Sequence, residues 1–153
     1  MFTGIVTDIG RVREVRETDR DRRYEIETAW NTAGIDLGAS ISHAGCCLTV
    51  TEKGPGWFAV EVSGETLSKT KLGDWTENTR VNLERAAKLG DELGGHIVTG
   101  HVDAVGRIVA VDPGRGFVIL KDDVIWRRRS NGCVGHVDLP FRTTNRPGDQ
   151  WFL

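Results

Sequence analysis

A short phrase occurs twice in this chain, 96 positions apart. The first copy, "TGIVTDIGRV", spans residues 3–12, and the second, "TGHVDAVGRI", spans residues 99–108. The matched pairs are Thr3 and Thr99, Gly4 and Gly100, Val6 and Val102, Gly10 and Gly106, and Arg11 and Arg107. A period of this length exceeds the roughly 20–50 residues of solenoid repeats. We therefore predict a duplicated domain in which each copy begins with this phrase.

Between the two phrases, apolar and polar residues alternate in short runs that are typical of β-strands. The predicted strands lie within residues 2–15, 22–30, 39–54, 57–63 and 80–86. The range 39–54 is expected to turn at Ala44–Gly45, and residues 64–70 to form a short helical turn. A shift of alternation near Asp8–Gly10 predicts a β-bulge. This pattern predicts an all-β barrel or sandwich over residues 1–86.

The remaining sequence predicts a linker and a partial second copy. Residues 87–97, "AKLGDELGGHI", interrupt the strand pattern, and we expect a linker with a helical turn. Residues 98–153 then repeat the opening strand, and "RTTNRPGDQWF" at 142–152 echoes "LTVTEKGPGWF" at 48–58. The intervening stretch alternates poorly, so the second copy is expected to be incomplete or divergent.

Charge and composition exclude several classes of partner. The net charge is −2, with 39% hydrophobic and 27% charged residues, so we expect no nucleic acid as partner. No apolar stretch approaches the roughly 20 residues that cross a bilayer, which predicts no membrane association. The start, "MFTGIVTD", lacks the pattern of a signal peptide. Three cysteines, two of them adjacent, indicate reduced thiols and a cytoplasmic location.

Several separated motifs resemble the riboflavin synthase family in order and spacing. They are "MFTGIV" at 1–6, "GCCLTV" at 45–50 and "GDELGGHIVTGHVD" at 90–103. The resemblance is specific over residues 1–108 and weak beyond. It implies two similar six-stranded antiparallel Greek-key barrels. It also implies a cofactor-free transferase that converts two molecules of 6,7-dimethyl-8-ribityllumazine into riboflavin and 5-amino-6-ribitylamino-uracil. Family members form homotrimers whose sites lie between neighbouring subunits.

The resemblance also implies which residues form the site. The catalytic set is Cys47, Thr49 and His101. The substrate-binding set is Gly4, Val6, Ser40, Cys47, Thr49, Gly64, Glu65, Thr66, His101 and Val102. Their chemistry suits a flat polar ring with a polyhydroxylated chain, because hydroxyls, carboxylates and exposed backbone groups hydrogen-bond such ligands. A thiol or a water held by hydroxyls is a candidate nucleophile, and a histidine can move protons near neutral pH.

Taken without the family, several of these residues have plainer interpretations. Buried cysteines usually act as small hydrophobic residues, which we prefer for Cys46 and weigh evenly for Cys47. Thr49 alternates with apolar neighbours and also suits a strand. "HAGCC" and "CVGH" place His and Cys three apart, but no second ligand pair supports either, so we expect no metal site.

The second copy decides between three hypotheses about function. The leading one is a riboflavin synthase, and the alternative is a non-catalytic lumazine- or flavin-binding protein on the same scaffold. The third is a single barrel followed by an unrelated tail after about residue 109. "PFRTT" at 140–144 stands where the family carries a strand of the "SLTV" type. Thr143 falls opposite Thr49, whereas Pro140 and Arg142 depart from the pattern. This departure predicts weak or absent turnover with ligand binding retained by the first barrel.

Overall fold

The computed structural model of this chain describes residues 1–92, 94–95, 97–102, 108–112 and 117–120. In chain order its elements are β1 (Asp8–Glu17), β2 (Arg22–Glu27), the 3-10 helix η1 (Thr32–Gly34), β3 (Ser40–His43), β4 (Cys46–Gly54), β5 (Trp57–Val62), α1 (Gly64–Lys69), the 3-10 helix η2 (Lys71–Asp74), β6 (Arg80–Arg85), β7 (Ile108–Asp112) and β8 (Phe117–Leu120).

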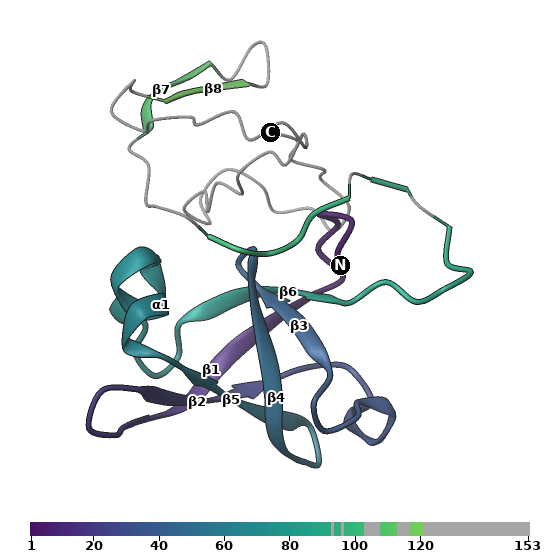
Figure 1. The fold of residues 1–153 in the computed structure, drawn as a ribbon, viewed down its shortest axis with the longest axis vertical. Coiled ribbons are helices and arrows are strands. Elements are labelled where there is room, and N and C mark those ends of the chain that lie inside the picture. Colours follow the sequence, from purple (N-terminus) through teal and green to yellow (C-terminus); the bar gives the residue numbers. More distant parts are fainter. Residues whose placement is uncertain (93, 96, 103–107, 113–116, 121–153) are drawn as a thin grey trace.

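Strands β1 to β6 form a closed barrel in the order β1–β2–β5–β4–β3–β6 (Figure 1). Every neighbouring pair is antiparallel, including β1 with β6, which closes the barrel. Strands β3, β4 and β5 form two successive hairpins, and β2 lies beside β5, which is Greek-key connectivity. The prediction of an all-β, six-stranded antiparallel Greek-key barrel is therefore confirmed.

The barrel is filled by the inward-facing residues of its strands. Tyr24, Ile26, Phe58 and Leu83 are each fully buried. Burial of each large apolar side chain stabilises the fold by about 1.5–3 kcal/mol. Tyr24 carries a hydroxyl, which donates to the carbonyl of Leu72 at 2.7 Å and so fastens η2 to the barrel.

The predicted turn between β3 and β4 is confirmed. Ala44 and Gly45 have φ angles of 48° and 89°. Two successive positive φ values are the geometry of a type I′ turn, whose twist matches that of the flanking strands. Glycine adopts this conformation without strain, so the short "AG" segment fixes the register in which His43 lies opposite Cys46.

The first strand begins later than the alternation predicts. We expected strand structure from residue 2, whereas β1 begins at Asp8. Gly4 has a φ of 84°, which interrupts an extended strand. The amides of Thr3 and Gly4 donate to the carboxylate of Glu84 instead of to a neighbouring strand. A side chain far along the chain thus replaces the strand pairing expected here.

The expected bulge near Asp8–Gly10 was also wrong. The register of β1 against β2 shifts between Val12 and Glu14. Gly10 serves close packing, because a Cβ there would lie 2.6 Å from Leu83 Cδ1 and 2.8 Å from the carbonyl oxygen of Glu27. The glycine is therefore explained by close approach of neighbouring strands.

The residues directly before the two repeated phrases pair with each other. Phe2 and Val98 form an antiparallel bridge, with N–H···O distances of 2.8 and 2.9 Å. The matched glycines Gly4 and Gly100 have nearly the same φ, 84° and 79°. The predicted linker contains one turn, over residues 88–91. It is closed by a hydrogen bond from the Asp91 amide to the Lys88 carbonyl.

Only part of the predicted second copy can be described. Strands β7 and β8 pair as a separate antiparallel hairpin (Figure 1). Residues 103–107 and 121–153, which include Pro140, Arg142 and Thr143, lie outside the described residues. The prediction of a partial second barrel over 98–153 therefore stays a prediction.

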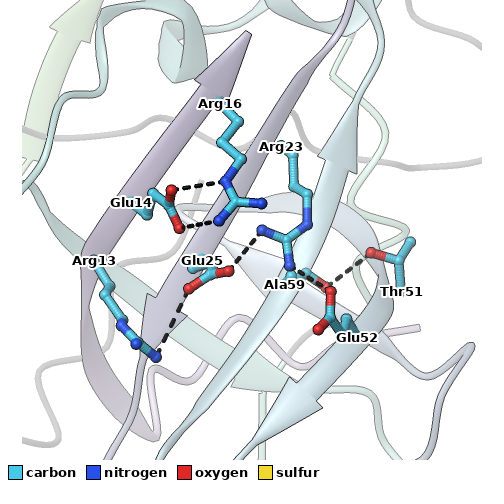
Figure 2. A network of polar contacts seen from close by, with 8 residues as sticks. All are labelled: Arg13, Glu14, Arg16, Arg23, Glu25, Thr51, Glu52 and Ala59. Atoms are coloured by element: carbon cyan, nitrogen blue, oxygen red, sulfur yellow. Dashed lines mark hydrogen bonds and ion pairs between the residues drawn. The ribbon is translucent and has the colours of Figure 1, made fainter. Parts of the chain in front are cut away.

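Charged side chains cover the outer face of β1, β2 and β4 (Figure 2). Arg23 lies between two carboxylates, 2.7 Å from Glu25 Oε1 and 2.6 Å from Glu52 Oε2. Arg13 also approaches Glu25, at 3.7 Å, and its guanidinium lies 5.2 Å from the centroid of the Trp57 ring. This network contains none of the residues predicted to bind a ligand.

Candidate functional site

Strand β4 turns two of the predicted site residues toward the outside of the barrel. Its side chains at Cys46, Leu48 and Val50 are buried in the core. Because neighbouring strand residues face opposite sides, Cys47 and Thr49 lie on the outer face. Cys47 is half-buried and Thr49 is exposed. The barrel therefore presents a thiol and a hydroxyl side by side on its surface.

Strand β3 extends this surface with two serines. Ser40 pairs directly with Thr49, and Ser42 pairs with Cys47. Directly opposed side chains on one face of an antiparallel pair have Cβ atoms about 4.5–5.5 Å apart. The β3–β4 pair thus gathers three hydroxyls and one thiol on its outer face.

Helix α1 begins at the end of the barrel where β4 also begins. It follows β5 directly, and the Ser63 hydroxyl caps it by accepting from the amide of Thr66 at 3.2 Å. Glu65 is exposed in its first turn, and Thr66 is half-buried. Because β4 and β5 are antiparallel neighbours, Val62 at the end of β5 and Cys46 at the start of β4 share this end. The fold brings α1 to the same end of the barrel as Cys47.

Gly64 occupies a tight position at the start of α1. Its amide donates to Asp21 Oδ1 at 3.1 Å. A Cβ at this position would lie 2.7 Å from the carbonyl oxygen of Arg20. Packing against the β1–β2 hairpin therefore accounts for the glycine, and its role in ligand binding stays a prediction.

Residues 97–102 pass over the tip of the β3–β4 hairpin (Figure 1). The carbonyl of Gly100 accepts a hydrogen bond of 2.9 Å from the Cys47 amide. A side chain at position 100 would lie 2.8 Å from Cys47 Cβ and 3.0 Å from Phe2 Cε2. Val102 packs against the core cluster, whereas His101 is exposed. The structure thus places the start of the second phrase directly against the predicted site.

The opening segment reaches the same region. Gly4 donates its amide to Glu84 Oε2 at 3.1 Å, and Val6 is half-buried. The Phe2 ring lies close to Gly100, so residues 1–6 and 97–102 meet beside Cys47. These contacts link residues 97–102 to β4, and the opening segment to β6 and to residues 97–102.

Burial changes the acidity of two side chains in the β3–β4 hairpin. The pKa of the Cys46 thiol rises to about 11, mainly because burial disfavours the thiolate and further because Cys47 lies beside it. Cys46 therefore remains a protonated packing residue, in line with the interpretation we preferred. Burial lowers the pKa of His43 to about 4, so its imidazole is neutral at physiological pH.

Metal chemistry receives no support from the described ranges. Among residues 1–92, 94–95 and 97–102, no three His, Cys, Asp or Glu side chains converge to hold an ion. The pairing of His43 with Cys46 follows from their hairpin register. Cys133 and His136 lie outside the described residues. Within the part of the chain that is described, no helix has the length and apolarity needed to cross a membrane.

Two open hollows lie at the opposite end of the barrel, around the hairpin that joins β4 and β5. One, of about 450 Å³, is lined by Trp30, Lys53 and Pro55 among others. The second, of about 400 Å³, includes Arg13 and Trp57. Neither hollow contains a predicted site residue.

Sequence reasoning missed Glu84 and the packing role of Gly100. In "RVNLERA", Glu84 occupies an outward position of the strand, where a charged residue ordinarily faces water. The structure instead buries it beneath Thr3 and Gly4, with 7% of its surface exposed. Alternation alone carries no signal for this burial, because the covering segment comes from the other end of the barrel sequence.

Comparison with known proteins identifies the barrel. The family described as "Lumazine binding domain" matches residues 3–86, which include all six barrel strands. The chain belongs to the lumazine-binding domain family. The "Riboflavin synthase" of Brucella abortus (strain 2308) is 49% identical over 114 residues, which cover 71% of this chain and 56% of that protein. The "Riboflavin synthase" of Mycobacterium tuberculosis (strain ATCC 25618 / H37Rv) is 45% identical over 122 residues, covering 79% and 61%.

This lumazine-binding domain chain thus spans little more than half the length of those relatives. Among solved structures, LumP complexed with riboflavin superposes with a TM-score of 0.64 at 24% identity, covering 71% of this chain and 59% of LumP. That likeness establishes the same fold.

Proposed function

We propose that this chain acts in riboflavin biosynthesis as a riboflavin synthase. One molecule of 6,7-dimethyl-8-ribityllumazine would transfer a four-carbon unit to a second molecule, which makes the enzyme a transferase. The products are riboflavin and 5-amino-6-ribitylamino-uracil. The observation that carries the proposal is the lumazine-binding barrel, in a chain that is 45% and 49% identical to two riboflavin synthases over 122 and 114 residues. No cofactor enters this reaction.

The ligand surface we propose lies on the outer face of β3 and β4. Ser40, Thr49 and Thr66 supply hydroxyls. Glu65 supplies an exposed carboxylate at the end of the barrel where β4 begins. Such groups suit the ribityl chain, because each of its hydroxyls both donates and accepts hydrogen bonds. Gly4, Val6, Gly64 and Val102 would border the ring. Ligand specificity would then come from the hydroxyls and the carboxylate on this surface.

For the chemistry, proximity of the two lumazines is the main contribution that we propose. Holding two reactants in register provides a large part of many enzymatic rate enhancements. Cys47 is the candidate nucleophile that activates one lumazine, with Thr49 positioning a water as the other candidate. His101 is exposed on the segment seated beside Cys47, where it can accept a proton from the other substrate.

The second half-site belongs to the duplicated copy in this proposal. The bridge between Phe2 and Val98 joins the equivalent positions directly before the two phrases, and Gly4 and Gly100 share one backbone conformation. Both observations support a duplication with approximate two-fold symmetry. We further propose a cytoplasmic homotrimer, in which a neighbouring subunit completes the site.

Riboflavin formation tests the proposal. The full chain, incubated with 6,7-dimethyl-8-ribityllumazine, should yield riboflavin above the uncatalysed rate, measured by chromatography with fluorescence detection. Because Pro140 and Arg142 depart from the family pattern, we expect turnover to be weak. Binding without any riboflavin would favour the non-catalytic binding protein, and loss of both binding and turnover would refute a lumazine site.

Glu65→Ala provides a residue-level test of the same surface. If Glu65 holds ribityl hydroxyls, its removal should weaken lumazine binding by about 1–3 kcal/mol, the value of a hydrogen bond to a charged group. Glu77→Ala is the matched control, because Glu77 is exposed in the loop before β6. Equal affinities in the two variants would remove Glu65 from the site.

A further inference from the structure

The carboxylate of Glu84 is buried on the outer face of β6, where it accepts three hydrogen bonds from the first residues of the chain. Oε1 accepts from the Thr3 amide at 2.6 Å and from the Thr3 hydroxyl at 2.7 Å. Oε2 accepts from the Gly4 amide at 3.1 Å. All three donors are neutral groups, and two of them are backbone amides. Hydrogen bonds to a charged acceptor are stronger than those between neutral groups, so this carboxylate fixes the opening segment firmly.

The segment that Glu84 holds in turn holds residues 97–102. Phe2, directly before Thr3, exchanges two backbone hydrogen bonds with Val98. Two residues later, the Gly100 carbonyl accepts from the Cys47 amide at 2.9 Å. A continuous set of contacts therefore leads from Glu84 on β6, through the opening segment and Val98, to Cys47 on β4.

Close packing makes this arrangement sensitive to displacement. The Phe2 ring is buried and lies against the position of Gly100, where even a methyl group would be too close. Ser42, which pairs with Cys47, also lies opposite Glu84 on β6 and is buried. A shift of the opening segment would therefore be transmitted to the backbone around Cys47.

We propose that Glu84 is a positioning residue: it seats the opening segment so that residues 97–102 lie against Cys47 in the geometry that the ligand site requires. The inference rests on the function proposed above, because it assigns Glu84 a purpose in that site. Glu84 acts through Thr3 and Gly4, and no contact between Glu84 and ligand is part of the proposal.

Glu84→Gln tests the proposal in the full chain. Glutamine keeps one acceptor oxygen, which can bond to the amide of either Thr3 or Gly4. Its NH₂ group is a donor and would face the other amide, which is also a donor. Thr3→Val is a milder second variant that removes the hydroxyl donor to Glu84, together with the longer bond of 3.3 Å in which this hydroxyl accepts from the Ile5 amide. Glu25→Gln is the matched control, because Glu25 is also buried on the outer face of the barrel but is held by Arg13 and Arg23 (Figure 2).

Two readouts are combined. Amide hydrogen exchange measured by NMR reports whether Val98 and Cys47 still donate to Phe2 and Gly100. Riboflavin titration, followed by flavin fluorescence, reports the ligand site. For Glu84→Gln, we expect both amides to exchange about tenfold faster and the Kd to rise about tenfold, as loss of one charge-assisted hydrogen bond predicts. Thr3→Val should change both in the same direction by less, and Glu25→Gln should change neither.

Each other outcome contradicts the proposal. Unchanged exchange in Glu84→Gln would show that the carboxylate does not seat the segment, and faster exchange with an unchanged Kd would show that the seating does not serve the site. Equal effects in Glu25→Gln would indicate general destabilisation. If Glu84→Gln does not fold, Thr3→Val decides by the same criteria. If the unmodified chain does not bind riboflavin, both the proposed function and the role of Glu84 in that site are refuted. The exchange data would still show whether Glu84 holds the opening segment in place.

Discussion

His43 should make the stability of the barrel depend on pH between 7 and 4. Its side chain is fully buried in β3, and its ring packs edge-on against Phe58 with centroids 5.5 Å apart. Nδ1 lies 3.0 Å from the Ile41 carbonyl, which can only accept, so Nδ1 carries the proton. Nε2 has no hydrogen-bond partner among the described residues. A second proton on this ring would therefore place an uncompensated charge in the core.

The magnitude follows from the pKa of His43, which burial lowers from its ordinary value of 6.5 to about 4. The unfolded chain binds the proton at the higher pKa, so protonation favours the unfolded state. The free energy of unfolding is therefore highest when His43 is neutral in both states, above about pH 6.5. It decreases as the pH falls toward 4. The loss is about 2 kcal/mol between pH 7 and pH 5, and about 3 kcal/mol by pH 4.

Urea unfolding followed by tryptophan fluorescence measures this effect. His43→Val removes the titrating group and introduces a residue suited to a strand. The substitution lowers the free energy of unfolding by the same amount at every pH. Only the difference in pH dependence between the two proteins is therefore informative. The unmodified chain should lose about 2 kcal/mol more than His43→Val between pH 7 and pH 5. His101→Ala, which changes an exposed histidine, should retain the pH dependence of the unmodified chain.

Parallel pH profiles for the unmodified chain and His43→Val would refute this reasoning. Such a result would mean that the His43 ring finds a partner for Nε2 when protonated, or that the barrel opens locally to admit water.

Three further predictions concern packing, thiol reactivity and helix capping. Gly100→Ala should weaken riboflavin binding more than Gly90→Ala, as measured by fluorescence titration. Both glycines have positive φ, but only at position 100 would the new methyl group meet Cys47. Alkylation with iodoacetamide at pH 8, followed by peptide mass spectrometry, should modify Cys47 before Cys46, because Cys46 is buried and its pKa is raised to about 11; the reverse order would contradict the assigned faces of β4. Ser63→Ala should lower the free energy of unfolding by about 1 kcal/mol through loss of the α1 cap, and an unchanged urea midpoint would show that the cap is dispensable.

The alternation of the sequence predicted the barrel strands well because the barrel has one interior. Val81 and Leu83 in β6, or Leu48 and Val50 in β4, must face that interior, and period-two patterns report this requirement directly. The Ala44–Gly45 turn was equally predictable, because its left-handed geometry favours glycine.

The outer face was harder to predict because its burial depends on distant segments. Thr3 and Gly4 fit the alternation of polar and apolar residues that continues into β1. They nevertheless bond to Glu84, which lies about eighty positions further along the chain. The position of Gly100 against Cys47 is likewise a tertiary contact. Family resemblance is the source of the prediction that Cys47, Thr49 and His101 form the site, whereas the contacts of Glu84 became visible only in the structure.

The most direct test of the account locates the ligand on the full chain. Riboflavin is titrated into ¹⁵N-labelled protein, and amide chemical shifts are followed by NMR. The account predicts shifts concentrated at Cys47 and Thr49, at residues 64–66 and at residues 100–102. Shifts confined to the hollows around the β4–β5 hairpin at residues 54–57, or no shifts at all, would contradict the assignment of the outer face of β3 and β4 as the lumazine site.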